Sequence, residues 1–233
     1  TSTFDGGEVI EIDGNHRLNI FSTSGDFKVL QPMAEGIPMF RKDFKLGKRI
    51  ASARIYSSAL GVYDLFINGQ RVGTPQEDGS MLYDELKPEW TDYRKTVHYQ
   101  TYDVTSLLHK GLNVVGAQVS SGWFTGDVNH GEYGIHDLGF IAKMVINYTD
   151  GSSETIVTDT SWLSSTSGPI CLGDIYHGET YDARRETAWT KPGYNTSKWN
   201  KTAVNTYFKG QIIGFAGPTV QVRPEMKRMP VSI

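Results

Sequence analysis

The sequence predicts an all-β protein, an antiparallel β-sandwich of jelly-roll-like form with long loops. Three observations predict it. Short segments rich in β-branched and aromatic residues follow one another, Asn-Gly and Asp-Gly pairs end two of them, and 25 of the 233 residues are glycine. Strand-length segments with turn signals at short spacing are typical of two packed antiparallel sheets.

The first expected unit is residues 1–38, which are rich in glycine and polar side chains and have weak periodicity. We interpret them as a lead-in segment or the tail of a preceding domain, and expect the sandwich over residues 39–233. The expected strands occupy residues 50–58, 60–67, 96–104, 112–119, 139–148 and 154–158.

Turn residues connect these strands. Asn68-Gly69 and Asp150-Gly151 predict hairpins, because these residue types tolerate the positive φ that tight turns need. Residues 103–111 offer a cap residue, a short apolar pair and a terminal glycine, which predicts a single helical turn between strands.

Long irregular segments are expected at residues 74–93, 120–138 and 173–199. Loops of this length usually carry function or pack as lids. They contain four of the five tryptophans, Trp90, Trp123, Trp189 and Trp199. We interpret this clustering as the main indication of function, with stacking on sugar rings and packing of the loops as the two alternatives for Trp90 and Trp123.

Composition limits the partners. A formal charge of −3 argues against nucleic acid or an anionic membrane as the main partner. No apolar run approaches the roughly 18–20 residues of a membrane span, and the N-terminus shows no signal-peptide pattern. The single cysteine, Cys171, excludes an internal disulfide or a cysteine-based metal site, and its flanks predict a short buried strand.

Catalytic motifs are missing from the sequence. It has no Gly-x-Ser-x-Gly elbow and no His-Glu-x-x-His motif, and its six histidines are scattered. Paired carboxylates for glycoside hydrolysis stay open, because such residues pair in space rather than in sequence. The loop carboxylates are Asp84, Glu85, Glu89, Asp92, Asp127, Glu132, Asp137, Asp174 and Glu179. We expect most of them to be solvated.

Calcium binding suits the loop carboxylates better than catalysis does, because this ion takes six to eight oxygen ligands from carboxylates, amides and carbonyls. Asp84 and Glu85 are adjacent, and a second loop carries Asp127, Asn129 and Glu132. A different polar group, Tyr181 with Asp182 and Arg184, is either a polar site or a buried Asp–Arg pair that fixes a loop to a sheet, and we expect the second.

Five motifs occur in order along the chain. They are ARIYSSALGVYDLFINGQRVG (residues 53–73), LKPEWTDY (86–93), YQTYDVT (99–105), GWFTG (122–126) and GETYDAR (178–184). This series resembles the N-terminal β-sandwich domain of bacterial α-L-rhamnosidases of glycoside hydrolase family 78, and the resemblance covers about residues 39–233.

The resemblance implies a non-catalytic domain, because the family's catalytic carboxylates lie on a separate (α/α)₆ barrel. Some of these sandwiches are calcium-dependent rhamnose-binding modules. By position, the metal ligands would be Asp84, Glu85 and Asn129, with the sugar resting on Trp123 or Tyr133 and touching the same three ligands. L-rhamnose or a rhamnosylated glycan, and the other domains of a parent enzyme, are the expected partners.

The chain departs from the family pattern at three places. Glu89 replaces the usual glycine of Pro-Gly-Trp-Thr, Glu85 stands where an amide is expected, and the loop over residues 73–86 is longer. The alternative function is therefore a purely structural sandwich that supports the catalytic barrel. Under either function, the resemblance implies polysaccharide degradation and a secreted or periplasmic bacterial enzyme whose signal peptide is absent from this chain.

Overall fold

The computed structural model describes residues 36–129, 133, 137–222, 226, 228, 229 and 231. It also describes two paired antiparallel strands, β1 (Val9–Glu11) and β2 (Leu18–Ile20). Apart from these strands, residues 1–35 of the predicted lead-in segment lie outside the described residues.

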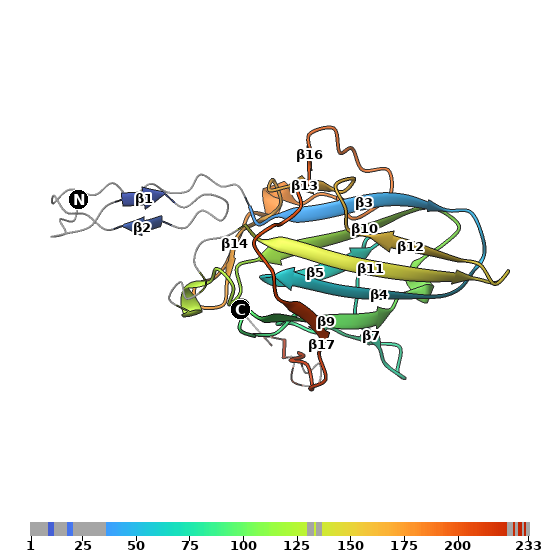
Figure 1. Cartoon of the computed structure of the whole chain (residues 1–233), viewed down its shortest axis with the longest axis horizontal. Helices are drawn as coiled ribbons and strands as arrows, with labels where there is room; N and C mark the ends of the chain where they lie inside the picture. Colours follow the sequence, from blue (N-terminus) through green and yellow to red (C-terminus); the bar gives the residue numbers. More distant parts are fainter. Residues whose placement is uncertain are drawn as a thin grey trace.

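Two sheets form the body of the molecule (Figure 1). The six-stranded sheet has the order β16 (Asn200–Lys201), β13 (Leu163–Ser165), β3 (Met39–Leu46), β10 (Gly111–Ser120), β5 (Val62–Ile67) and β6 (Gln70–Arg71). The five-stranded sheet has the order β12 (Ser153–Val157), β11 (Gly139–Tyr148), β4 (Ile50–Leu60), β9 (Thr96–Asp103) and β17 (Gln211–Gly214). The pairings are antiparallel except that of β17 with β9, which confirms the predicted all-β sandwich.

The predicted strands agree with the observed ones to within two residues at each end. The hairpin at Asn68-Gly69 is confirmed: Ile67 pairs with Gln70, and the two turn residues have φ of 51° and 86°. The turn at Gly151 is longer, because the Tyr148 amide donates to the Ser152 carbonyl at 2.9 Å.

The long loops contain small elements of their own. Two hairpins join β7 (Thr74–Pro75) to β8 (Met81–Leu82) and β14 (Ile170–Asp174) to β15 (Gly178–Tyr181). Three short 3₁₀ turns are η1 (Thr105–Leu107), η2 (Asp127–Asn129) and η3 (Ala183–Arg185). None of these could span a membrane, and no other helix in the described ranges could either.

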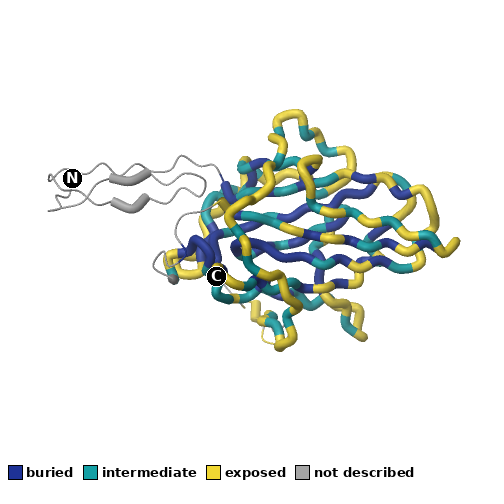
Figure 2. Tube along the Cα trace, in the orientation of Figure 1, coloured by how far each residue is buried: buried dark blue, intermediate teal, exposed yellow. Residues whose placement is uncertain are grey.

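The core lies between the sheets, where Figure 2 shows the buried residues concentrated along the central strands. The central strand β10 buries five consecutive residues, 113–117, which requires cover on both of its faces. Trp189 supplies the outer cover. A Cβ on Gly116 would lie 2.6 Å from the Trp189 ring, so the glycine makes room for the indole.

Two loop tryptophans lie against each other on this sheet face. Trp189 is buried, and its ring lies 5.9 Å from that of the half-buried Trp199. Arg41, also buried, donates to the carbonyl oxygens of Trp189 and Lys191 and holds this loop against the six-stranded sheet. For the buried Trp189, the interpretation of the clustering as an indication of function was wrong, because its ring packs on β10.

Candidate functional site

Asp84, the first of the predicted metal ligands, lies where the loop before β9 meets the C-terminal part of the chain. Its side chain is almost fully buried, with 6% of the residue exposed. One carboxylate oxygen, Oδ2, accepts a hydrogen bond from the Tyr102 hydroxyl of β9 at 2.6 Å. The other, Oδ1, accepts from Thr219 Oγ1 at 2.6 Å and from Gln221 Nε2 at 2.8 Å.

We call residues 200–222 the C-terminal strap. It begins at β16 on one sheet, passes to β17 at the edge of the other, and continues to Gln221 (Figure 1). Its end pairs with the loop that carries Asp84, through an antiparallel bridge of Asp84 with Gln221 and a hydrogen bond from the Glu85 amide to the Val220 carbonyl at 2.9 Å.

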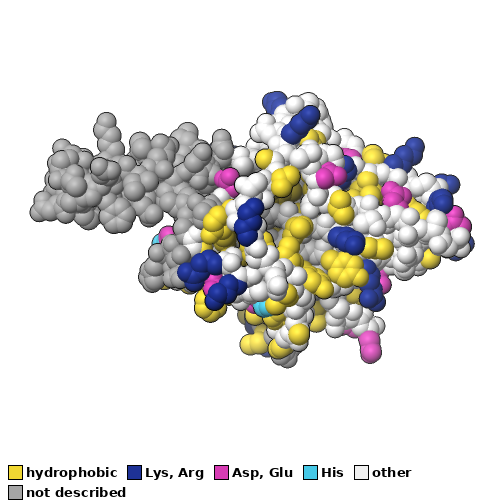
Figure 3. All heavy atoms as spheres, in the orientation of Figure 1, with side chains coloured by type: hydrophobic (Ala, Val, Ile, Leu, Met, Phe, Trp, Pro, Cys, Tyr) yellow, Lys and Arg dark blue, Asp and Glu magenta, His cyan; other side chains and the backbone are white. Residues whose placement is uncertain are grey.

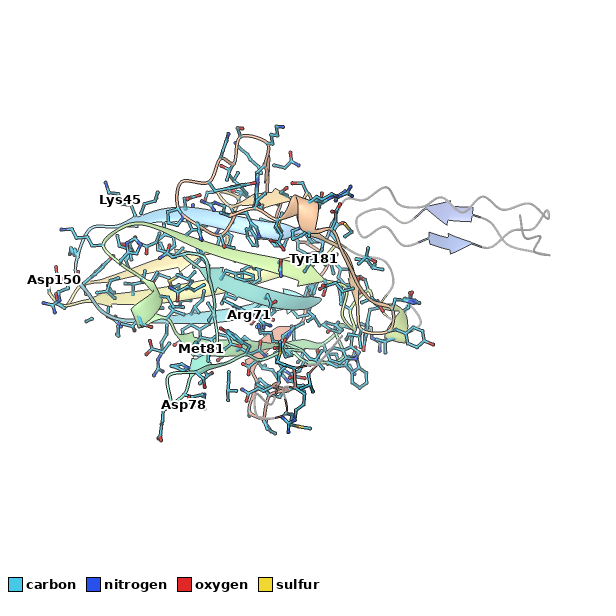
Figure 4. All side chains as sticks on the ribbon, turned by 180° about the vertical axis from the view of Figure 1, so that it is seen from behind. Lys45, Arg71, Asp78, Met81, Asp150 and Tyr181 are labelled. Atoms are coloured by element: carbon cyan, nitrogen blue, oxygen red, sulfur yellow. The ribbon has the colours of Figure 1, made fainter. Side chains whose placement is uncertain are left out.

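The second member of the acidic pair, Glu85, takes part in a neighbouring ionic network. Arg71 donates to both carboxylate oxygens of Glu85, at 3.2 and 2.9 Å, and to Asp64 at 2.7 Å. Lys87 is fully buried and donates to the Asp84 carbonyl at 2.7 Å and to Asp64 at 3.2 Å. Figure 4 shows Arg71 against the body of the sandwich, whereas Asp78 projects from a loop tip.

This arrangement shifts the pKa values of Asp84 and Lys87. Burial alone would raise the pKa of Asp84, but the hydrogen bonds from Thr219, Tyr102 and Gln221, with Lys87 nearby, hold that pKa below its usual value. Burial is the largest influence on Lys87 and lowers its pKa despite Asp64. Asp84 is therefore an ionised group whose acceptor positions face donors of the protein itself.

This donor set does not fit a calcium ion as it stands. Calcium needs several oxygens that are free to point at it, whereas Asp84 accepts three hydrogen bonds and Glu85 is paired with Arg71. Among the residues that the structure describes, no group of three or more histidine, cysteine, aspartate or glutamate side chains could hold a metal. The third predicted ligand, Asn129, ends η2, and its side chain lies outside the described residues.

The predicted sugar platforms lie in an aromatic cluster at another part of the core. Tyr133 is 6% exposed, its ring contacts Tyr93, and its hydroxyl donates to the Thr91 carbonyl at 3.1 Å. Trp123 is half-buried and packs against the core. Stacking by either ring stays a prediction, and for Tyr133 it requires that the ring first be uncovered.

An exposed tryptophan lies elsewhere. Trp90 is 57% exposed and follows Glu89, whose φ of 76° is the left-handed conformation that glycine adopts most easily. The family glycine that Glu89 replaces thus matches a backbone requirement. The sequence left open whether Trp90 packs in its loop or stacks on a sugar ring. Trp90 and Trp189 both lie in long irregular loops, so only their exposure in the structure distinguishes them.

The remaining polar candidates are arranged as follows. Asp127 and His177 form an exposed pair at 2.7 Å, and Asp174 accepts from the backbone amide of His177 at 3.0 Å. Asp182 does pair with Arg184, at 2.8 Å, but the arginine side chain is 89% exposed. The expectation of a buried pair was wrong, because both residues belong to the exposed turn η3, which Asp182 caps. Cys171 is on a strand, β14, but only half-buried.

A cavity of about 660 Å³ lies at another place, where the end of β4 and the start of β11 face the C-terminal strap. Its lining is mainly apolar and includes Leu60, Phe140, Trp162 and Phe208. This volume is within the roughly 300–1,000 Å³ range of small-ligand sites. Sequence reasoning missed it, because its walls come from segments as far apart in the sequence as Pro38 and Ile212.

Comparison with known proteins adds to this geometry. The model of the family described as alpha-L-rhamnosidase N-terminal domain matches residues 48–224. The α-L-rhamnosidase of Streptomyces avermitilis is 42% identical over 182 residues, which are 76% of this chain and 16% of that protein. One from Formosa agariphila is 35% identical over 163 residues, 68% of this chain and 17% of its own length.

Solved structures agree. The S. avermitilis α-L-rhamnosidase, solved in complex with L-rhamnose, superposes with a TM-score of 0.72 at 38% identity, over 86% of this chain and 19% of that one. The chain thus spans less than a fifth of the length of these relatives.

Proposed function

This chain belongs to the family of α-L-rhamnosidase N-terminal domains, and on that premise we propose that it is a non-catalytic accessory sandwich of an α-L-rhamnosidase, whose role is to support the other domains of that glycoside hydrolase. The observation that carries the proposal is the arrangement around Asp84. The carboxylate at the predicted binding position holds the C-terminal strap in place through Thr219 and Gln221.

Energetics support a structural role for this carboxylate. A buried, ionised group that accepts three hydrogen bonds would lose them all if it turned toward an ion or a sugar. The donors come from β9 and from the strap, so Asp84 joins the five-stranded sheet to the end of the domain. A domain that holds neighbouring domains in fixed positions needs such a connection between its sheet and its C-terminal strap.

We propose calcium-assisted binding of L-rhamnose or a rhamnosylated glycan as the second candidate. Two observations favour it. The S. avermitilis relative was solved with L-rhamnose, and Trp90, which is 57% exposed, lies in the same loop as Asp84 and Glu85. For this function the Asp84 carboxylate would have to exchange the hydrogen bonds that it accepts from Tyr102, Thr219 and Gln221 for the ion. Trp90 would offer an exposed ring to the sugar.

Calorimetry separates the two candidates. L-rhamnose is titrated into the 233-residue chain up to millimolar concentration, once with calcium and once with a chelator. The structural role predicts no sugar-dependent heat in either case. A calcium-dependent heat that is lost in Asp84→Asn and kept in Asp78→Asn would establish the second candidate, since Asp78 is an exposed carboxylate at a loop tip (Figure 4).

Tryptophan variants then locate the sugar, if it binds. Trp90→Ala is expected to remove binding supported by an exposed ring, and Trp123→Ala is the matched variant of the half-buried platform that the sequence favoured. Loss of binding in Trp123→Ala alone, with an unchanged unfolding midpoint, would assign the platform to Trp123.

A further inference from the structure

The C-terminal strap contains an unusually uncharged surface segment. Residues 210–222 carry no aspartate, glutamate, lysine, arginine or histidine. Four of their large apolar side chains are nonetheless exposed: Ile212 at 40%, Ile213 at 40%, Val220 at 47% and Val222 at 61%. Single exposed apolar residues are ordinary, but a continuous uncharged segment of this kind marks a surface that another body covers.

Both faces of strand β17 are partly exposed. Neighbouring residues of a strand point to opposite faces of the sheet, and here the neighbours Ile212 and Ile213 are equally exposed. β17 is also the last strand of the five-stranded sheet and pairs only with β9 in its order. Soluble proteins normally protect such an edge with charge or proline, and residues 211–214 have neither.

The cavity continues this apolar surface. Ile212 lines it, together with Val204 of the strap, which is 69% exposed, and Ile141 of β11, which is 46% exposed. Charged side chains such as Asp137 and Lys201 also belong to its wall. Figure 3 shows hydrophobic side chains gathered on this face of the molecule. An apolar centre beside charged residues is the usual composition of a protein–protein interface.

The cavity is filled by an occupant that supplies a convex apolar group. A second copy of this chain would bring the same patch against itself, residue i of one copy against residue j of the other, and the oligomeric state tests that alternative. In the relatives, more than four-fifths of the polypeptide lies outside the region that this chain matches.

We propose that Ile141, Val204, Ile212 and the cavity that they line form the docking surface for another domain of the same α-L-rhamnosidase polypeptide, which inserts an apolar group into the cavity. This inference rests on the proposed function and adds to it the surface through which the sandwich supports its neighbour.

Thiol labelling tests the proposal. In a Cys171→Ser background, Ile212→Cys places one thiol on β17 at the wall of the cavity, and Val157→Cys places a matched thiol at the opposite edge of the same sheet, where Val157 is 44% exposed. Both are labelled with a maleimide in the 233-residue chain and in the full-length α-L-rhamnosidase that contains it. We expect labelling of Ile212→Cys to slow by about tenfold or more in the full-length protein, because the centre of an interface excludes solvent, and labelling of Val157→Cys to be unchanged.

Equal labelling of Ile212→Cys in the two proteins, with α-L-rhamnosidase activity present, would overturn the docking surface and leave the proposed function intact. Absence of that activity from the full-length protein would overturn the proposed function, and the labelling ratio would still decide whether the cavity face of β17 is covered. Sedimentation of the 233-residue chain supplies the last outcome. A dimer that Ile212→Lys dissociates would assign the surface to a second copy and refute the proposal.

Discussion

Asp84 and Gln221, which are 137 residues apart in the sequence, meet through a hydrogen bond of 2.8 Å from the glutamine amide to the buried carboxylate. The same two residues form an isolated antiparallel bridge. The contact closes the domain, because it fixes the end of the C-terminal strap to the loop that leads into β9.

Asp84→Asn is expected to lower the free energy of unfolding by about 1–3 kcal/mol, since the neutral amide replaces a charged acceptor that three donors share. Urea unfolding followed by tryptophan fluorescence measures the change. Asp78→Asn is the control, because Asp78 bonds only locally, to Ser80, and we expect no measurable change from it. Equal midpoints for Asp84→Asn and the parent chain would contradict the structural role of Asp84.

Acid is expected to remove the stabilisation that the ionised Asp84 side chain contributes to the folded state. The pKa of Asp84 is lowered in the folded protein, so its stabilisation is fully present above the unfolded value of about 4 and is lost as pH falls through the folded pKa. Other carboxylates titrate in this range too, so the useful quantity is the difference in unfolding free energy between the parent chain and Asp84→Asn. That difference should shrink as pH falls from 5 to 2, and a difference that stays constant would count against the assignment.

Gly116→Ala is expected to destabilise the sandwich by about 1–3 kcal/mol, because the added methyl overpacks against the Trp189 ring, 2.6 Å from the new Cβ. Thermal or urea unfolding gives the magnitude, and the tryptophan emission spectrum reports the displaced indole. Gly47→Ala is the matched control: nothing lies within 4 Å of its Cβ, and its φ is not positive. If both variants unfold at the parent midpoint, Trp189 does not cover β10.

The isolated chain is expected not to hydrolyse aryl α-L-rhamnosides. The proposed function assigns the chemistry to another domain, and Asp127, one of the exposed loop carboxylates, forms an ion pair with His177. Release of the chromogenic aryl group is measured with the S. avermitilis enzyme as the positive control. Turnover that persists through repurification and disappears on mutation of a loop carboxylate would refute this prediction.

The sequence predicted the strands and the tight turn because both depend on near neighbours. Alternating apolar residues define a strand face locally, and Asn68 with Gly69 adopts the positive φ that those two residue types permit. Glu89 is the complementary case. Its φ of 76° is a conformation suited to glycine, and the residue type itself does not predict it.

The sequence could not separate exposed tryptophans from buried ones. Trp90 and Trp189 both stand in long loops, yet one is 57% exposed and the other 6%. The difference depends on what lies opposite each ring. Trp189 meets Gly116 of β10, which is 73 positions earlier, and no local pattern records such a pair.

For this protein the sequence by itself determined the fold class, six of the strands, the tight turn at Asn68-Gly69 and the family, but not β3 (Met39–Leu46) or the short strands of the sheet edges. These follow from periodicity, from φ preferences and from motifs read within a few tens of residues. Only the tertiary structure decided that Asp84 holds the C-terminal strap, that Lys87 is buried beside it, and that β17 leaves an uncharged apolar edge. The physical reason is that the burial of a charge and the cover of a strand edge depend on which distant segments meet, and those contacts form only when both sheets are assembled.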